Sequence, residues 1–285
     1  MEKNLTTGSV FKNVLFFSLP YLLSYFLQTL YGMADLFIIG QFEGVASTTA
    51  VSIGSQVMHM LTVMLVGLAM GTTVSIGQAV GAGDRKKAAR DIGNTVVLFM
   101  TVALVLMAGL LLLVKPIVSV MSTPMEAARG TVTYLTICFI GIPFITGYNI
   151  ISSIFRGLGD SKSPMYFIAV ACAANIVLDY LFMGVLHLGP AGAALGTTLS
   201  QAISVAVSLI VIWKRKLIVL EKEDFAPRRP VMGSILKIGI PIAMQDGLIQ
   251  MEILGFSREV TLIDYGVTSD PEKFVTEICI PVKCE

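Results

Sequence analysis

Three aspartates lie inside long apolar segments of the sequence: Asp35, Asp179 and Asp246. A charged side chain in the middle of a membrane-spanning helix costs about 2.5 to 3.5 kcal/mol on insertion scales, so each of these residues calls for an explanation. Removal from water favours the neutral, protonated form of a carboxyl, and a second carboxylate nearby favours it further. A pair of such aspartates could therefore hold and release a proton near neutral pH.

The elements that would position these carboxyls are membrane-spanning helices. The chain has 285 residues, of which 55% are apolar and only 14% are charged, and its mean hydropathy is +0.80. Soluble proteins carry roughly 25% charged residues, whereas about 20 consecutive apolar residues form a helix that crosses a bilayer. Six segments are near or above that length: residues 14–39, 51–80, 92–114, 131–154, 165–186 and 191–213. The sequence therefore predicts an all-α integral membrane protein with a six-helix transmembrane bundle in residues 1–213.

More polar sequence follows the six segments. Residues 214–234 form a basic linker, which we expect in the cytoplasm. Residues 235–254 begin a seventh apolar segment that meets Glu252 before it reaches full length, so we expect a partial seventh helix. Residues 255–285 form a polar tail, in which residues 275–283 alternate like a half-buried strand. We expect this soluble tail to be either a short α/β fragment or disordered.

Basic residues alternate between the two sides of the predicted bundle. Fifteen Lys and Arg residues lie in the N-terminal segment, in the loops at residues 85–90 and 156–162 and in the stretch 214–237, whereas the intervening loops hold two, Lys115 and Arg129. Lys and Arg are enriched in the cytoplasmic loops of membrane proteins. We therefore expect a multi-pass protein of the plasma membrane with a cytoplasmic N-terminus.

The predicted helices place several polar residues at one depth. Counting about 1.5 Å per residue from the predicted outer ends puts Asp35 about 7 Å and Asp179 about 10 Å into the membrane, and Thr197 and Thr198 about 9 Å. Asn175 lies one turn before Asp179 on the same helix face. These groups from three helices could converge in a cluster that binds a coupling cation. In the alternative, Asn175 and Asp179 form only an interhelical hydrogen-bonded contact and Asp35 faces water.

The partial seventh helix holds a second polar pair. Asp246 lies beside Gln245, near the midplane of the bilayer, and we expect the two to form a second polar or substrate site.

Small residues and prolines indicate how the helices pack. Gly67 with Gly71, and Gly192 with Gly196, have the spacing that lets helix backbones approach closely in lipid. Pro143 lies within an apolar segment, where it removes one backbone hydrogen bond and favours a kink or a hinge.

Other chemistry finds no support in the sequence. His59 and His187 lie in separate segments, and no Ser/His/Asp or Cys/His arrangement can be assembled around them, so we expect no enzyme and no catalytic residues. The four cysteines lack the CxxC or mixed His/Cys spacing of metal sites, and we expect neither a metal nor a cofactor. The net charge of +1 gives no basic excess for a nucleic-acid partner.

Five motifs carry a further signal: YGMADLFIIG (31–40), GQAVGAGDRKKAAR (77–90), FRGLGDSKSPM (155–165), NIVLD (175–179) and GAALGTTLSQ (192–201). In order and spacing they resemble the multidrug and toxic compound extrusion (MATE) family, over about residues 8–250. Members of this family are twelve-span transporters, built from two six-helix lobes, that exchange protons or sodium for organic cations.

The resemblance implies roles for individual residues. It implies that Asp35 is the carboxylate of a cation site in the N-lobe, with Asn175, Asp179 and Thr197 as its partners. It also implies that Pro20 is the hinge at which the first helix bends. The coupling ion is expected to be H+ or Na+, and the partners are expected to be the lipid bilayer and small organic cations.

The resemblance ends near Met251, so the second lobe is expected to be missing, and a truncated or chimeric reading frame is the leading explanation. The favoured function is a cation-coupled antiporter, driven by protons in preference to sodium, that exports organic cations by alternating access. Its missing C-lobe would come from another chain or from a second copy of this one. One alternative is a half-transporter that is inactive alone. Another is a flippase for lipid-linked substrates, which would need Lys or Arg inside the spans.

Overall fold

The computed structural model describes residues 9–215 and 221–264, with side chains placed except for Val10 and residues 253–264. Every regular element in these ranges is a helix. The elements are α1 (Val10–Phe42), α2 (Val45–Gly81), α3 (Arg85–Val120), α4 (Met125–Ile140), α5 (Ile142–Gly157), α6 (Lys162–Asp179), the π-helix η1 (Tyr180–Val185), α7 (Pro190–Arg215), the 3-10 helix η2 (Lys222–Phe225) and α8 (Arg229–Asp264). The strand-like pattern predicted at residues 275–283 lies outside the described ranges.

The prediction of six membrane spans is confirmed. Five helices are long and apolar enough to cross a bilayer within the described residues: α1, α2, α3, α6 with its continuation η1, and α7. The sixth span consists of α4 and α5, which are bent by 49° relative to each other. The bend lies at Gly141, two residues before Pro143, whose ring disfavours an unbroken helix. A Cβ atom at Gly141 would lie 2.7 Å from the side chain of Thr198, so glycine also lets α7 pack closely there.

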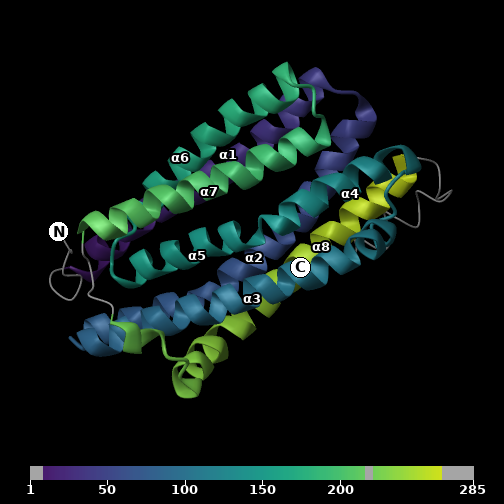
Figure 1. Cartoon of the computed structure of the whole chain (residues 1–285). Helices are drawn as coiled ribbons and strands as arrows, with labels where there is room; N and C mark the ends of the chain where they lie inside the picture. Colours follow the sequence, from purple (N-terminus) through teal and green to yellow (C-terminus); the bar gives the residue numbers. More distant parts are fainter. Residues whose placement is uncertain (1–8, 216–220, 265–285) are drawn as a thin grey trace, which may run out of the picture.

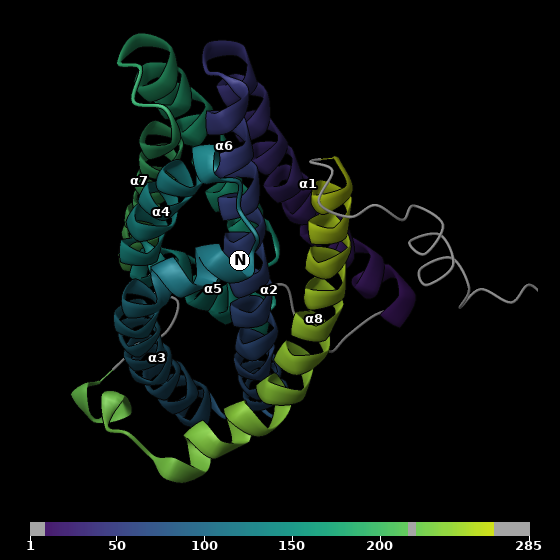
Figure 2. The same cartoon turned by 90° about the vertical axis from the view of Figure 1, so that its right-hand side faces the viewer.

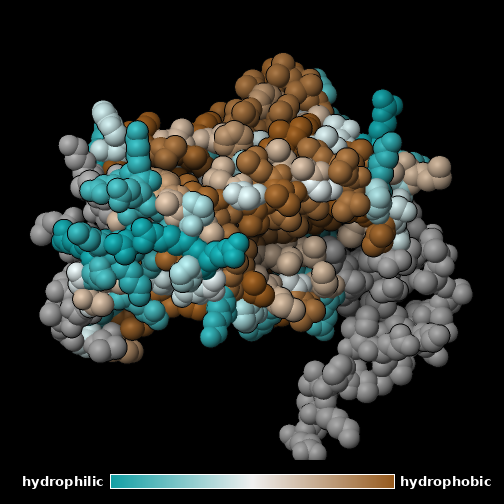
Figure 3. All heavy atoms as spheres, turned by 60° about the horizontal axis from the view of Figure 1, so that its bottom comes forward, coloured by the Kyte–Doolittle hydropathy of each residue, from teal (hydrophilic) through white to brown (hydrophobic). Residues whose placement is uncertain are grey.

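The helices form two layers that run between two polar ends (Figure 1). One layer contains α6 with α1 and α7 on its two sides, and the other contains α2 with α3, α4, α5 and α8 around it. We call the end at which α1, α3 and α8 begin the basic end, because Arg85, Lys86, Lys87 and Arg90 lie there, and the opposite end the far end. Figure 3 shows an apolar band between the two ends, with hydrophilic residues gathered at the basic end.

The seventh helix is longer than predicted. The structure extends α8 from Arg229 to Asp264, whereas the sequence indicated a helix over residues 235–254. Pro230 occupies the first turn, where its missing N–H costs no helical hydrogen bond, so the helix begins six residues earlier than the apolar pattern. Beyond residue 252 the charged residues end the apolar stretch but do not interrupt the backbone hydrogen bonding of a helix.

Glycines bring α8 against α2, on the side of α2 opposite α4 (Figure 2). A Cβ atom at Gly71 would clash with the carbonyl of Ile235, and one at Gly239 would clash with the carbonyl of Leu68. A Cβ atom at Gly67 would lie 2.9 Å from the backbone of α8. The close packing predicted from Gly67 and Gly71 is therefore confirmed, and the helix that packs there is α8.

Candidate functional site

Three helices bring the predicted polar residues together in the interior of the protein. Asp35 comes from α1, Asn175 and Asp179 come from the end of α6, and Thr197 comes from α7. All four are buried, with exposed fractions of 3% for Asp35, 0% for Asn175 and Asp179, and 6% for Thr197. We call these four residues the acidic cluster. The depth that the sequence assigned to them therefore corresponds to a real convergence.

Asp35 is the hydrogen-bond acceptor at the centre of the cluster. Asn175 donates from Nδ2 to Asp35 Oδ1 at 3.2 Å, and Thr197 donates from Oγ1 to Asp35 Oδ2 at 3.2 Å. Each carboxylate oxygen thus receives one donor, and the two donors come from two different helices. This arrangement suits an ionised carboxylate and links the position of α1 to those of α6 and α7.

Asp179 lies beside Asp35 but is bound differently. Its carboxyl interacts electrostatically with that of Asp35, yet neither of its oxygens has a well-formed hydrogen bond to any described residue. Asn175 Oδ1 also lacks a partner among the described residues. A buried polar oxygen without a partner is costly. These three oxygens are therefore the atoms of the cluster that are available to a proton or to a small cation.

The backbone at Asp179 is unusual as well. Asp179 is the last residue of α6, and the π-helix η1 begins at Tyr180. Single turns of π-helix within α-helices occur frequently at functional sites, because the wider turn changes the direction of the side chains around it. The sequence predicted one continuous span over residues 165–186 and contained no signal for this change of helix type.

Gly196 makes room for the Asp179 carboxyl. A Cβ atom built on Gly196 of α7 would clash with Asp179 Oδ1. The sequence indicated only close helix packing at Gly192 and Gly196, so it missed that Gly196 shapes the cluster. By contrast, a Cβ atom on Gly192 would lie 3.1 Å from Phe182 and 3.2 Å from Met183, so Gly192 serves close helix packing and does not border the cluster.

Tyr31 is a second residue of the site that the sequence reasoning missed. It lies one helical turn before Asp35 on α1, and its hydroxyl lies next to Thr197 and within electrostatic reach of Asp35 and Asp179. The signal was present in the sequence, because residues four apart share a helix face. A phenol at this position can donate a hydrogen bond to a carboxylate without adding charge.

Three other predicted polar residues lie elsewhere. Thr198 is buried but packs against Gly141 at the break between α4 and α5. Asp246 lies on α8, with its carboxyl against Gly67 of α2, and its neighbour Gln245 is exposed. The structure therefore does not bring Asp246 or Gln245 to the acidic cluster, because α8 packs on α2 and α3 whereas the cluster belongs to α1, α6 and α7.

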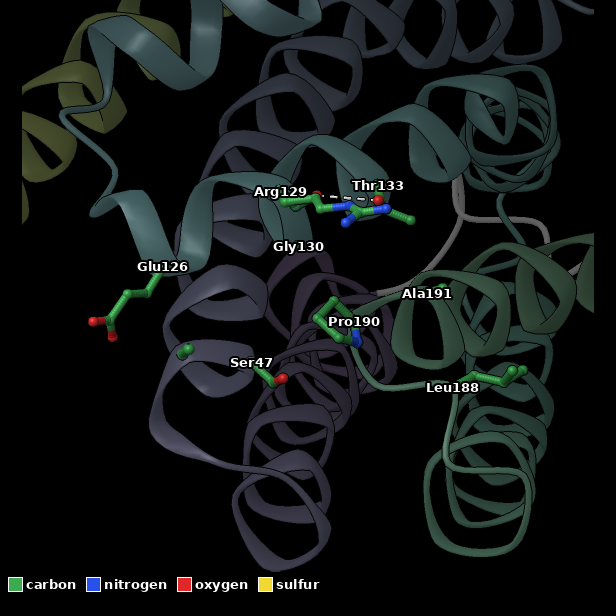
Figure 4. Close-up of a pocket in the computed structure, with 9 residues that line it drawn as sticks. Ser47, Glu126, Arg129, Gly130, Thr133, Leu188, Pro190 and Ala191 are labelled. Atoms are coloured by element: carbon green, nitrogen blue, oxygen red, sulfur yellow. Dashed lines mark hydrogen bonds between the residues drawn. The ribbon is translucent and has the colours of Figure 1, made fainter.

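A surface pocket of about 320 Å³ opens at the far end, separate from the acidic cluster. It is formed by the beginnings of α2, α4 and α7, and its lining includes Ser47, Arg129 and Pro190 (Figure 4). The Arg129 carbonyl accepts a hydrogen bond from Thr133, while the Glu126 carboxylate points away from the Arg129 guanidinium. None of the residues lining the pocket belongs to the cluster, so the pocket does not give direct access to it.

The described residues offer no clear site for a bound metal cofactor. Among the side chains placed within residues 9–215 and 221–252, no group of three or more His, Cys, Asp or Glu residues is arranged to hold a metal ion.

Comparison with known sequences identifies one family. The family described as MatE matches residues 20–181. The probable multidrug resistance protein YpnP of Bacillus subtilis is 36% identical over 243 residues, which cover 84% of this chain and 54% of that protein. The multidrug export protein MepA of Staphylococcus aureus is 25% identical over 283 residues, covering 95% of this chain and 62% of that protein. The chain thus spans about half the length of the curated relatives it matches.

Solved structures show the same architecture. A MOP superfamily transporter from Pyrococcus furiosus, whose binding pocket is described as having reversed polarity, superimposes with a TM-score of 0.82 at 25% identity, over 90% of this chain and 56% of that one. A MATE structure described as the bent conformation superimposes with a TM-score of 0.80 at 26% identity, over 90% of this chain and 57% of that one. The likeness covers nearly all of the described helices.

Proposed function

The chain belongs to the MatE family of multi-pass membrane proteins, and from this premise we propose that it is one lobe of a proton-coupled antiporter that exports organic cations by alternating access. The observation that carries the proposal is the acidic cluster, in which Asp35 accepts two hydrogen bonds while the neighbouring Asp179 carboxyl has no well-formed one among the described residues. The names of the relatives, which describe multidrug resistance and multidrug export, support the same substrate class.

The two carboxyls provide the proposed chemistry of coupling. Two buried carboxylates side by side repel each other and have lost their hydration, so a single proton held by the pair relieves both costs. An organic cation that enters next to the pair replaces the charge of that proton and displaces it. Exchange of one monovalent cation for one proton moves no net charge, so a pH gradient drives it, tenfold per pH unit.

Sodium is the alternative coupling ion. The Asn175 oxygen and the two Asp179 oxygens are hard oxygen ligands, which suit an alkali cation as well as a proton. Hydrogen bonding of Asp35 by two neutral donors favours the proton, because Asp35 then stays ionised while Asp179 takes up H+.

We propose that transport requires a second lobe. The chain spans about half of its relatives, and α1 exposes a row of large apolar side chains that includes Phe11, Leu19, Leu22 and Phe26. Exposed apolar area of this kind suits lipid or a partner helix bundle. The second lobe would be a C-lobe or a second copy of the chain, and without a second lobe the described residues would form an inactive half-transporter.

We further propose that the basic end faces the cytoplasm at the plasma membrane. The basic residues at the start of α3 and the end of α7 support this orientation, because Lys and Arg next to membrane spans favour the cytoplasmic side.

The proposal predicts exchange of protons for a lipophilic cation in liposomes. The purified chain, alone and as a tandem fusion of two copies, is reconstituted with an acidic interior, and uptake of ethidium is followed by fluorescence, with and without sodium. We expect uptake that needs the pH gradient but not sodium, and that Asp35→Asn abolishes. Glu223→Gln, which changes an exposed acid on η2, is the matched control and should transport normally.

The outcomes separate the alternatives. Uptake by the fusion but not by the single chain would identify a half-transporter. Uptake that follows a sodium gradient would replace the proton as coupling ion. No uptake by either form would exclude a second copy as the missing lobe. Undiminished uptake in Asp35→Asn would overturn the proposal.

A further inference from the structure

Arg156 is a cation that the sequence places in a loop and the structure places in a helix. It lies in the last turn of α5, and its guanidinium is partly buried. Nη2 donates to Ser153 Oγ at 3.1 Å, and Nε is buried without a hydrogen-bond partner among the described residues. Among the side chains that the structure describes, the ion pair found joins Arg215 to Asp160, and no acidic partner of Arg156 is found there.

The guanidinium also interacts electrostatically with two tyrosines, Tyr148 of α5 itself and Tyr21 of α1. Arg156 Cζ lies 5.3 Å from the centre of the Tyr21 ring. A guanidinium within about 6 Å of an aromatic ring is attracted to its negative face, and the attraction is greater where both groups are shielded from water. Tyr21 therefore provides the electrostatic contact that a carboxylate would otherwise supply.

Tyr21 lies where the backbone hydrogen bonding of α1 is interrupted by a proline. It directly follows Pro20, which cannot donate a backbone hydrogen bond within the helix. Ser24 Oγ also donates to the Pro20 carbonyl at 2.8 Å, a pattern that often bends helices. Leu19 is 64% and Leu22 is 61% exposed, so the neighbouring apolar side chains do not tie this part of α1 to the other helices.

Arg156 itself is held firmly. Phe155, its neighbour in α5, is 1% exposed, and a Cβ atom at Gly157 would lie 2.8 Å from Ile76 of α2. A side chain from a well-packed helix thus contacts α1 beside Pro20, where α1 lacks one backbone hydrogen bond, and α1 is the helix that also carries Asp35.

We propose that Arg156 is a positioning residue that holds the basic-end half of α1 in place by stacking on Tyr21, and that release of this contact lets α1 move and carry Asp35 relative to Asn175 and Thr197. The inference rests on the proposed function in that it takes movement of α1 to be part of the transport cycle. Arg156 does not touch the acidic cluster, and it acts on Asp35 only through α1.

The test measures the position of α1 directly. In the full chain, with its four native cysteines replaced by alanine, nitroxide labels are attached at Phe11→Cys on α1 and Leu209→Cys on α7, both exposed positions, and their separation is measured by pulsed electron resonance. In the labelled chain without further substitution, the parent, we expect one main separation between the labels. In Arg156→Gln we expect roughly a tenfold rise in the fraction of molecules with a different separation, because a cation–π contact shielded from water is lost.

Further variants distinguish a specific contact from general loosening. Tyr21→Phe keeps the ring and should keep the parent distribution, whereas Arg156→Lys keeps the charge but not the planar group and should restore that distribution only in part. Tyr21→Leu should match Arg156→Gln, and the double variant should show no added effect. An unchanged distribution in Arg156→Gln and Tyr21→Leu, additive effects, or a displaced population in Tyr21→Phe as large as in Tyr21→Leu would overturn the proposal. The measurement needs no transport, so it can fail or succeed independently of the liposome experiment.

Discussion

Asp179 combines an unusual backbone with an unusual side-chain environment. It is the last residue before the π-helix η1, and its carboxyl is buried beside Asp35 without a well-formed hydrogen bond among the described residues. Space for this carboxyl exists because position 196 has no side chain. An unpaired buried carboxyl costs stability, and this cost supports the proposed binding of a proton or a small cation at Asp179.

Gly196→Ala tests this account of Asp179. The added methyl group clashes with Asp179 Oδ1, so we expect a loss of about 1 to 3 kcal/mol in the free energy of unfolding, as for an overpacked site, together with loss of ethidium exchange. Thermal unfolding of the purified chain measures the first effect and the liposome experiment measures the second.

A matched control and a second variant complete the comparison. Gly147→Ala adds the same methyl group at a position where the nearest side-chain atom is 3.6 Å away, and it should be neutral or stabilising by up to about 1 kcal/mol. Adding Asp179→Ala to Gly196→Ala should recover stability but not exchange. Equal stability of Gly196→Ala and Gly147→Ala would refute this account of the site.

The helices are positioned by close contacts at glycine rather than by charged pairs. Gly141 admits Thr198 of α7 at the break between α4 and α5, and Gly71 and Gly239 bring the backbones of α2 and α8 together. In lipid such packing replaces the hydrophobic effect as the force that associates helices. The seventh helix is thereby fixed to the six-helix bundle, although it contributes nothing to the acidic cluster.

Gly71→Ala should loosen the seventh helix. A methyl group at this position clashes with the Ile235 carbonyl, which belongs to the backbone and cannot rotate away. We expect a loss of about 1 to 3 kcal/mol in stability and faster proteolysis of the linker before α8, measured by thermal unfolding and by limited digestion. Gly81→Ala, on the same helix with nothing within 4 Å, is the control and should leave both quantities unchanged or slightly improved. Similar digestion rates for the two variants would show that this contact does not hold α8.

At the scale of the whole molecule, the sequence predicts how deep each residue lies in the membrane, whereas the contacts between residues depend on how the helices pack side by side. The rise of a helix is constant, so the amino-acid order alone assigns Asp35, Asp179 and Thr197 to one depth and places Asn175 one turn from Asp179 on the same face. The depth of a residue in the membrane does not tell which helices are neighbours. Polarity within a span therefore makes Asp246 and Thr198 candidates as well, whereas the packing places Asp246 against α2 and Thr198 against Gly141.

Hydropathy predicts which residues lie inside the membrane, but it does not predict where a helix begins or ends. The sequence assigns Arg156 to a loop because its charge ends an apolar segment, yet α5 continues to Gly157. For the same reason α8 extends beyond the apolar residues that predict it. Gly196 and the π-helix η1 depend on the fit of one carboxyl between two helices, and no periodicity in the sequence describes such a fit.

Taken as one molecule, the chain is a six-span lobe with a seventh helix fixed to it, spanning about half of its relatives. The proposed function depends on Asp35 and Asp179 together holding one proton, which an organic cation displaces.

Infrared difference spectroscopy of the purified chain tests this proposal most directly, because a protonated carboxyl has its own carbonyl band. On addition of ethidium at neutral pH we predict loss of that band and release of one proton per bound ethidium. Both should vanish in Asp35→Asn and in Asp179→Asn. Ethidium binding without proton release, or an unchanged band loss in both variants, would contradict the account.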